Sequence, residues 1–229
     1  PWPHTDFDDV SSNACLNCHR SHHAPGEEEL LTDARDEEVC LKCHDGAVAD
    51  ASLGAAFRQP YRHPVRETSG SHQPGEIPDG FADHVTCVDC HNPHRAARRE
   101  AEPPFVPGML EGVSGITAAG TLIEEAVYEY EVCFKCHSEE SAPTWSGIER
   151  QLASQSIRRQ FTSGSPSYHP VVSPGMSMDI PSLIYPLTTD SMIYCSDCHS
   201  DDSPTARVFG ETGGPHGSRH EFLLKLEYQ

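Results

Sequence analysis

The sequence is short of the residues that normally build a protein core. Hydrophobic residues make up 36% of its 229 positions and aromatic residues 7%, which is less than a globular domain usually has. Glycine and proline, at 17 and 19 residues, interrupt both helices and strands. We therefore expect mostly irregular coil with short α-helices, in which a bound group replaces much of the missing core.

Two further shortages exclude classes of function. Lys and Arg number 16 against 35 Asp and Glu, so the formal net charge is −19, whereas a nucleic-acid-binding surface needs positive charge. No apolar run approaches the roughly 20 residues of a membrane-spanning helix. We therefore expect no nucleic-acid partner and no membrane span, and protein partners that present positive patches.

Cysteine and histidine, in contrast, are abundant and follow one repeated pattern. The ten cysteines form five C-x-x-C pairs, and a His directly follows every pair. The five motifs are CLNCH (15–19), CLKCH (40–44), CVDCH (87–91), CFKCH (133–137) and CSDCH (195–199). His fills only 15 of the 229 positions, so five coincidences are an inadequate explanation. The pattern is typical of covalent c-type haem attachment.

The spacing suits that chemistry. Two intervening residues let one helical turn place both sulfurs along one porphyrin edge, where the thiols add to vinyl groups, and the adjacent His reaches the iron. Zinc ribbons do not need the His, and disulfides do not need five copies of one dithiol motif. We predict five covalent haems c attached through Cys15, Cys18, Cys40, Cys43, Cys87, Cys90, Cys133, Cys136, Cys195 and Cys198. Their proximal iron ligands are predicted to be His19, His44, His91, His137 and His199.

Ten other histidines can supply the second axial ligands. His22 and His94 each follow a motif His by three residues, an offset that can present the ring to a neighbouring haem but not easily to its own. His23 is a rival to His22. His216 lies in a glycine-rich turn after the last motif, which would hold its ring beside a haem. Further histidines in reserve are His4, His72, His84 and His220.

His63 and His169 complete the predicted distal set and belong to an internal repeat. Residues 40–94 and 133–199 both run from CxKCH through Phe, Tyr and His-Pro-Val to CxDCH, which indicates duplication of one unit. We expect two haem lobes, 1–100 with motifs 1–3 and 101–229 with motifs 4 and 5, within one continuous multihaem domain. Short helices are expected at the motifs, for example over 37–44, with a longer one over 146–160. A loop or small β-hairpin is expected over 108–120.

These motifs together resemble the multihaem c-type cytochromes with doubled CxxCH motifs found in metal-reducing anaerobic bacteria. The resemblance covers most of the chain and rests on CLNCHRSHH with CLKCH, CVDCHNPH, YEYEVCFKCH, SYHPV, and CSDCH with GPHGS. It implies low-spin bis-His haems stacked in a chain, a role in electron transport, and export to the periplasm or the extracellular space. It also implies that His94, His169 and His216 are distal ligands.

Electron transfer along a chain of five haems is therefore the predicted function, with other redox proteins or extracellular electron acceptors as partners. The alternative is that the protein forms a homopolymer, an extracellular cytochrome filament with the same row of haems in each subunit. In such a filament His4 would ligate a haem of the neighbouring subunit. A reductase needs an iron with an open site. In familiar five-haem nitrite reductases, the catalytic motif ends in Lys, whereas all five motifs here end in His. We therefore predict an electron carrier and no enzyme.

Overall fold

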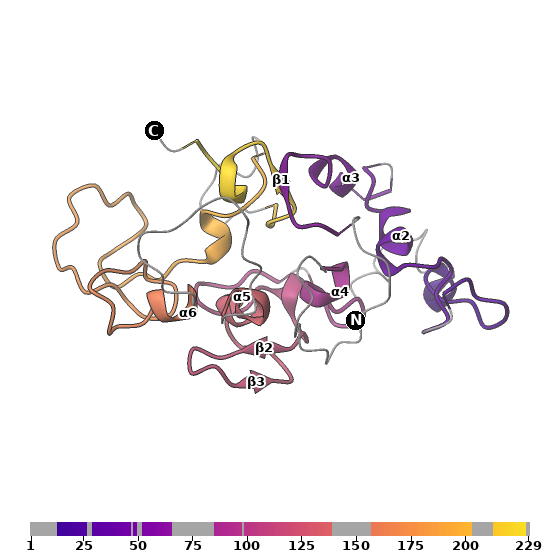
Figure 1. Cartoon of the computed structure of the whole chain (residues 1–229), viewed down its shortest axis with the longest axis horizontal. Coiled ribbons are helices and arrows are strands. Elements are labelled where there is room, and N and C mark those ends of the chain that lie inside the picture. The colour runs from indigo at the N-terminus through magenta and orange to yellow at the C-terminus, as the bar shows by residue number, and fades with distance from the viewer. Residues whose placement is uncertain are drawn as a thin grey trace.

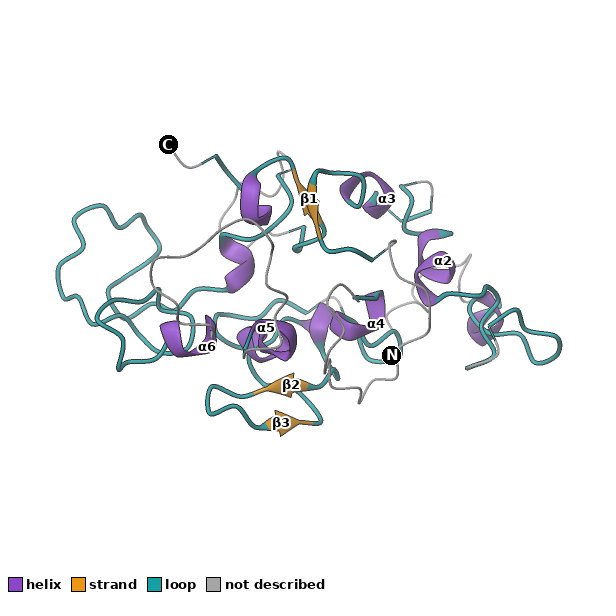
Figure 2. Cartoon of the chain, in the orientation of Figure 1, coloured by secondary structure: helices purple, strands orange, loops and turns teal. Residues whose placement is uncertain are grey.

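The computed structural model describes residues 13–26, 29–46, 48–49, 52–65, 85–97, 99–138, 157–202 and 213–227. Most of this part of the chain is coil and turn, as Figure 2 shows. Its α-helices are α2 (Asp36–Leu41), α3 (Leu53–Ala56), α4 (Cys87–Cys90), α5 (Glu129–His137) and α6 (Ile157–Gln160). Its 3-10 helices are η2 (Ala14–Asn17), η3 (Gly108–Leu110), η4 (Cys195–Asp197) and η6 (Glu221–Leu223). The predicted irregular fold with short helices is confirmed.

The strands are equally short and form two separate antiparallel pairs. β2 (Gly115–Ile116) pairs with β3 (Leu122–Ile123) in a hairpin whose turn places Gly120 at φ +86, a conformation that favours glycine. The small hairpin expected near 108–120 is thus confirmed, slightly further along the chain. β1 (Tyr61–Arg62) pairs with β4 (Gly217–Ser218), so the last segment of the chain lies against the segment that carries His63 (Figure 1).

Each CxxCH motif lies on a helical turn, and in motifs 3 and 5 an acidic side chain caps the start of that turn. In motif 3, the Asp89 side chain accepts the Thr86 N–H at 2.7 Å, and in motif 5 Asp197 accepts the Tyr194 N–H at 2.8 Å. Such reciprocal caps stabilise helices too short to persist alone. The helix predicted over 37–44 is observed as α2. Of the helix predicted over 146–160, α6 forms the last four residues, and residues 146–156 lie outside the described residues.

The side-chain core is small and centres on α5. One cluster joins Val106, Val113, Ala126 and Val132, and a second joins Tyr130, Phe134 and Val171. Phe134, inside the fourth motif, is only 1% exposed. Both clusters contact motif cysteines, Cys90 in the first and Cys195 in the second. The side-chain core therefore adjoins the haem attachment positions.

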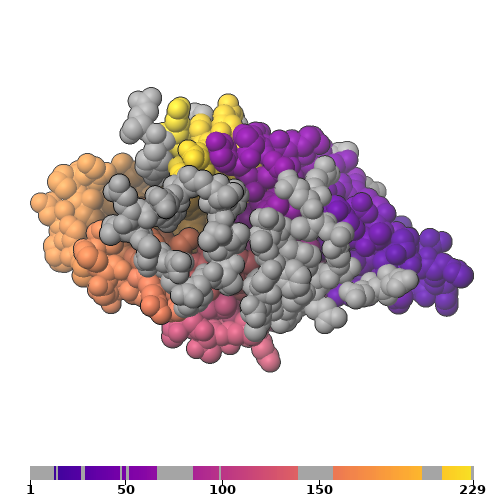
Figure 3. Space-filling model, viewed as in Figure 1, coloured from indigo at the N-terminus to yellow at the C-terminus, as the bar shows by residue number. Residues whose placement is uncertain are grey.

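The ends of the molecule are formed by different parts of the chain. Figure 3 shows the first motif (indigo) at one end of the long axis and the segment around 172–193 (light orange) at the other. Contacts such as the β1–β4 pair join the two predicted lobes in between. None of the described helices is long and apolar enough to cross a bilayer.

Candidate haem attachment sites

All five motifs present their two cysteines from a single helical turn. The His backbone N–H donates to the carbonyl oxygen of the first Cys, at 2.8 Å in motif 1, 3.0 Å in motif 2 and 2.9 Å in motifs 3 and 5. Motif 4 lies within α5. Residues three apart on such a turn share one face, which places both thiols on the same side. The ten thiols are free of disulfides, so each pair is able to bind covalently.

In three motif histidines, a hydrogen bond to a backbone carbonyl oxygen sets the tautomer of the imidazole. Nδ1 lies 2.8 Å from the Glu29 carbonyl oxygen in His19, 2.9 Å from that of Met109 in His91, and 2.9 Å from that of Phe222 in His199. A carbonyl oxygen only accepts, so Nδ1 carries the proton and Nε2 presents a lone pair. Metal-ligating histidines are oriented in this way.

Two of the predicted distal histidines are held likewise. His63 donates Nδ1–H to the Pro215 carbonyl oxygen at 2.6 Å, and His216 donates to that of Gly213 at 2.6 Å. Burial lowers the pKa of His63, and burial with the neighbouring His91 lowers the pKa of His216 to about 4. Both rings are therefore neutral at neutral pH, the form that binds metal.

Gly214 makes room for the His216 ring. Its φ is +76, and a Cβ there would lie 2.8 Å from Cε1 of His216. No L-residue with a side chain would fit without moving the imidazole. The glycine-rich turn noted in the sequence thus acts by positioning one ring.

The structure brings motif and non-motif histidines together in three pairs. Ring centroids are 6.0 Å apart for His19 and His94, 6.0 Å for His91 and His216, and 6.3 Å for His137 and His63. Two imidazoles on opposite sides of one metal, with bonds of about 2.0 Å and nitrogens about 1.1 Å from the ring centres, would lie about 6.2 Å apart.

Aromatic contacts can also have this separation, but all three pairs combine one motif His with one predicted distal His. The interplanar angles of 9°, 25° and 57° do not conflict with the metal explanation, because rotation about the metal–nitrogen axis leaves the centroid distance unchanged. The three centroid distances are therefore compatible with an iron held between the two imidazoles of each pair.

For His22, His23, His169 and His199, no such pair is present among the described residues. His44 is half-buried just after α2. His22, His23 and His169 are exposed, and no ring contact joins them to another imidazole of the described residues. His199 likewise has no imidazole neighbour within ring-contact distance in the described part of the chain. His4, His72 and His84 lie outside the described residues.

Consecutive motifs are neighbours in space, in the order of the sequence. The thiols of Cys40 and Cys87 lie close enough to shift each other's pKa, and so do those of Cys133 and Cys195. The pKa of Cys18 is raised by partial desolvation and then by the thiols of motif 2, Cys40 and Cys43. The pKa of Cys90 is raised by burial and then by the thiols of motif 4, Cys133 and Cys136. The five attachment sites therefore form one continuous series.

The internal repeat is visible in these contacts. The Cys40–Cys87 contact corresponds to Cys133–Cys195, and the caps by Asp89 and Asp197 correspond to each other. The His-Pro-Val turns also match, because Val65 N–H donates to the His63 carbonyl oxygen at 2.9 Å and Val171 N–H to that of His169 at 2.8 Å. Two copies of one local structure therefore carry motifs 2–3 and 4–5.

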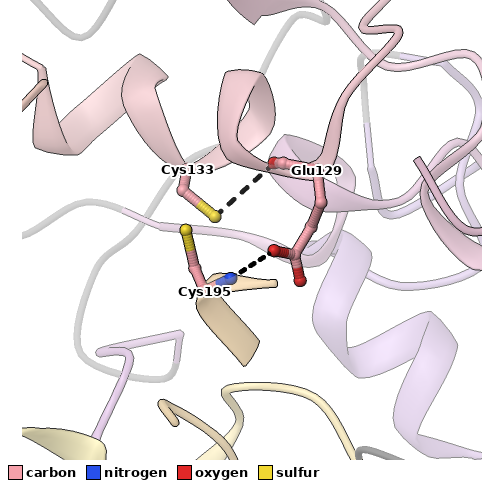
Figure 4. Close-up of side chains that lie close together, drawn as sticks. All are labelled: Glu129, Cys133 and Cys195. Atoms are coloured by element: carbon pink, nitrogen blue, oxygen red, sulfur yellow. Dashed lines mark hydrogen bonds between the residues drawn. The ribbon is translucent and has the colours of Figure 1, made fainter. Parts of the chain in front are cut away.

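Sequence reasoning missed Glu129, which lies beside the thiols of the fourth and fifth motifs (Figure 4). Glu129 is 3% exposed, and its Oε2 accepts the Cys195 N–H at 2.7 Å. A carboxylate oxygen of Glu129 and the sulfurs of Cys133 and Cys195 all lie within 4.8 Å of one another. Its position four residues before a motif Cys, shared by Asp36 before Cys40, was the available signal.

Comparison with known proteins gives one match. Residues 8–49, which contain the first two motifs, match the family described as the doubled CXXCH motif. No curated protein and no solved structure matches the chain. The match covers less than half of the chain, and with the motif geometry it supports a c-type cytochrome-like protein whose CxxCH motifs bind haem c covalently, which suggests haem-based electron transfer.

Proposed function

We propose that this chain conducts electrons through five covalent c-type haems, each ligated by two histidines, outside the cytoplasm. The observation that carries the proposal is the set of three His–His pairs at 6.0–6.3 Å, each made of a motif His and a non-motif His. The proposed haem series follows the motif order, because consecutive motif thiols are neighbours. Export follows from the attachment chemistry, which takes place beyond the cytoplasmic membrane in the cytochromes that this chain resembles.

The proposed ligand pairs link motifs that are two apart in the sequence. His94 follows motif 3 and serves the haem of motif 1, and His216 follows motif 5 and serves the haem of motif 3. His63 lies between motifs 2 and 3 and serves the haem of motif 4. His22 and His169 remain the proposed distal ligands of the other two haems.

In this proposal the haem supplies a one-electron Fe(III)/Fe(II) couple, and the protein limits what the iron can do. In the His91–His216 pair, backbone carbonyls hold both Nδ1 protons, so both Nε2 atoms would be available to hold the iron. Bis-His ligation also keeps the reduction potential below that of Met/His haems. These conditions suit an electron carrier better than a reductase, which needs an open axial position.

Spectroscopy of the purified holoprotein tests the proposal. The pyridine haemochrome assay should give five haems per chain, and the oxidised and reduced spectra should be low-spin. Neither CO with the reduced protein nor nitrite with the oxidised protein should change the spectrum. Three or fewer haems per chain would refute conduction through five haems. Binding of CO or nitrite by the unmodified monomer would favour the reductase.

One observation favours the filament as a second candidate function. His94 and His216 each serve an earlier motif than the one they follow, so a haem of motif 5 that is served in the same way would take its ligand from a second copy of the chain. His22 has the same offset after motif 1 and is exposed. In a head-to-tail array of subunits, His22 of the next copy would reach His199 of this one.

Replacing His22 with Ala tests that junction, with His23→Ala as the matched control. In a filament, the His22 variant should lose long assemblies in electron micrographs and should gain one high-spin haem per chain. Deleting residues 1–8 tests the same role for His4. If wild-type protein is monomeric with five low-spin haems, the filament is wrong and the carrier remains.

A further inference from the structure

Glu129 is a buried acid at the junction between two haem attachment sites. It begins α5, which carries Cys133 and Cys136, and its side chain reaches η4, which carries Cys195 (Figure 4). Its two carboxylate oxygens accept the Cys195 N–H and the Ser196 hydroxyl. The Glu129 side chain thus connects the fourth motif to the fifth, beside the two cysteines, Cys133 and Cys195, that would bind neighbouring haems.

No cation is paired with Glu129 among the described residues. Its charged or titratable neighbours on α5 and η4 are Cys133, Cys195 and Asp197, together with Tyr194 just before η4. On α6, which also packs against α5, Arg158 donates to the Ala118 carbonyl oxygen. Asp197 accepts the Tyr194 N–H. Within the described part of the chain, a negative charge on Glu129 is therefore stabilised only by neutral donors of Cys195 and Ser196.

We propose that Glu129 takes up a proton when the fourth or fifth haem is reduced, so that electron transfer across this junction is coupled to protonation. This inference rests on the proposed function. The electron comes from the redox partner and converts Fe(III) to Fe(II), and the proton comes from solvent and converts the carboxylate to a carboxylic acid. Net charge at the junction is then unchanged, which is favourable where water does not screen it.

The electrostatics of the site support this coupling. Burial raises the pKa of Glu129 to about 7, although the donors from Ser196 and Cys195 lower it. A group with such a pKa is part ionised near neutral pH, so an added electron nearby can change its protonation. Because reduction adds negative charge, the carboxyl binds its proton more tightly in the reduced protein.

The test is a redox titration of the holoprotein between pH 5 and pH 9, comparing wild type with Glu129→Gln. In wild type, the midpoint potential of one or two haems should rise as pH falls. The change is at most tenfold in the reduction equilibrium per pH unit, which is about 59 mV for one electron. In Glu129→Gln, which is uncharged at every pH, those haems should have the higher potential throughout and lose this slope.

Glu131→Gln is the matched control. Glu131 is also buried on α5, but its carboxylate accepts the N–H groups of Val127 and Tyr128. This variant should keep the wild-type slope. Equal slopes in wild type and Glu129→Gln would overturn the proposal.

A second measurement does not depend on folding of the Gln variant. Ser196→Ala removes one hydrogen-bond donor to the Glu129 carboxylate, which should raise the pKa of that group further. The pH range over which the midpoint potential changes should therefore lie higher than in wild type. Redox difference infrared spectra of wild type should show a protonated carboxyl band appearing on reduction. The absence of both effects would refute the proposal. Fewer than five low-spin haems would refute the proposed function instead, so the two failures are distinguishable.

Discussion

His216→Ala is the sharpest test of the ligand pairs. The variant removes an imidazole whose centroid is 6.0 Å from that of His91, so we expect it to open the axial position of the third haem alone. One haem in five should become high-spin, and the reduced protein should bind one CO per chain. His220→Ala is the control, because that imidazole has no hydrogen bond or ring contact among the described residues, and its variant should stay low-spin.

The structure also gives a magnitude for the effect on stability. The ring loses its hydrogen bond to the Gly213 carbonyl oxygen at 2.6 Å and its edge contact with Phe57 at 5.5 Å. A hydrogen bond contributes about 1 kcal/mol and an aromatic edge contact about 1 kcal/mol. Unfolding free energy should therefore fall by about 2 kcal/mol, apart from the metal bond.

The double variant His91→Ala with His216→Ala decides whether both residues serve one iron. If they do, the single variants and the double variant should each affect one haem per chain, because the two changes act on the same site. Counting high-spin haems by electron paramagnetic resonance gives the result. Two affected haems in the double variant would refute the assignment of His216 to the haem of motif 3.

Four further predictions concern other residues and the acidic surface. The variants His63→Ala and His137→Ala should show the same non-additivity, with one affected haem in either single variant and in the double variant, measured by CO stoichiometry. Because the folded-state pKa of Glu129 is raised from 4.5 to about 7, the contribution of this residue to stability should be greatest below pH 4.5. It should then fall by up to about 3 kcal/mol as pH rises to about 7, and Glu129→Gln should flatten this dependence in denaturant unfolding. Replacing Cys195 and Cys198 with Ser should leave one haem fewer per chain, as counted by the haemochrome assay. Electron exchange with a basic redox partner should slow as salt screens the acidic surface.

The attachment chemistry and the general fold could be predicted from the sequence. Five CxxCH motifs need only local chain, since Cys and His side chains at fixed offsets on one helical turn share a face whatever surrounds them. The irregular fold followed from composition, because a chain so rich in glycine and proline cannot form long helices. The short hairpin near Gly120 likewise followed from local turn residues. The helix at the second motif was expected over 37–44 and observed as α2 by the same local reasoning.

Tertiary structure decided which residues meet. The offset of His94 excluded its own haem but could not name His19 as its partner, because 75 residues separate them in the sequence. The pairing of β1 with β4 brings the Pro215 carbonyl oxygen to His63, and folding brings motif 5 to Glu129. These are long-range contacts set by packing of the whole chain, whereas a motif records only what neighbouring residues can do together.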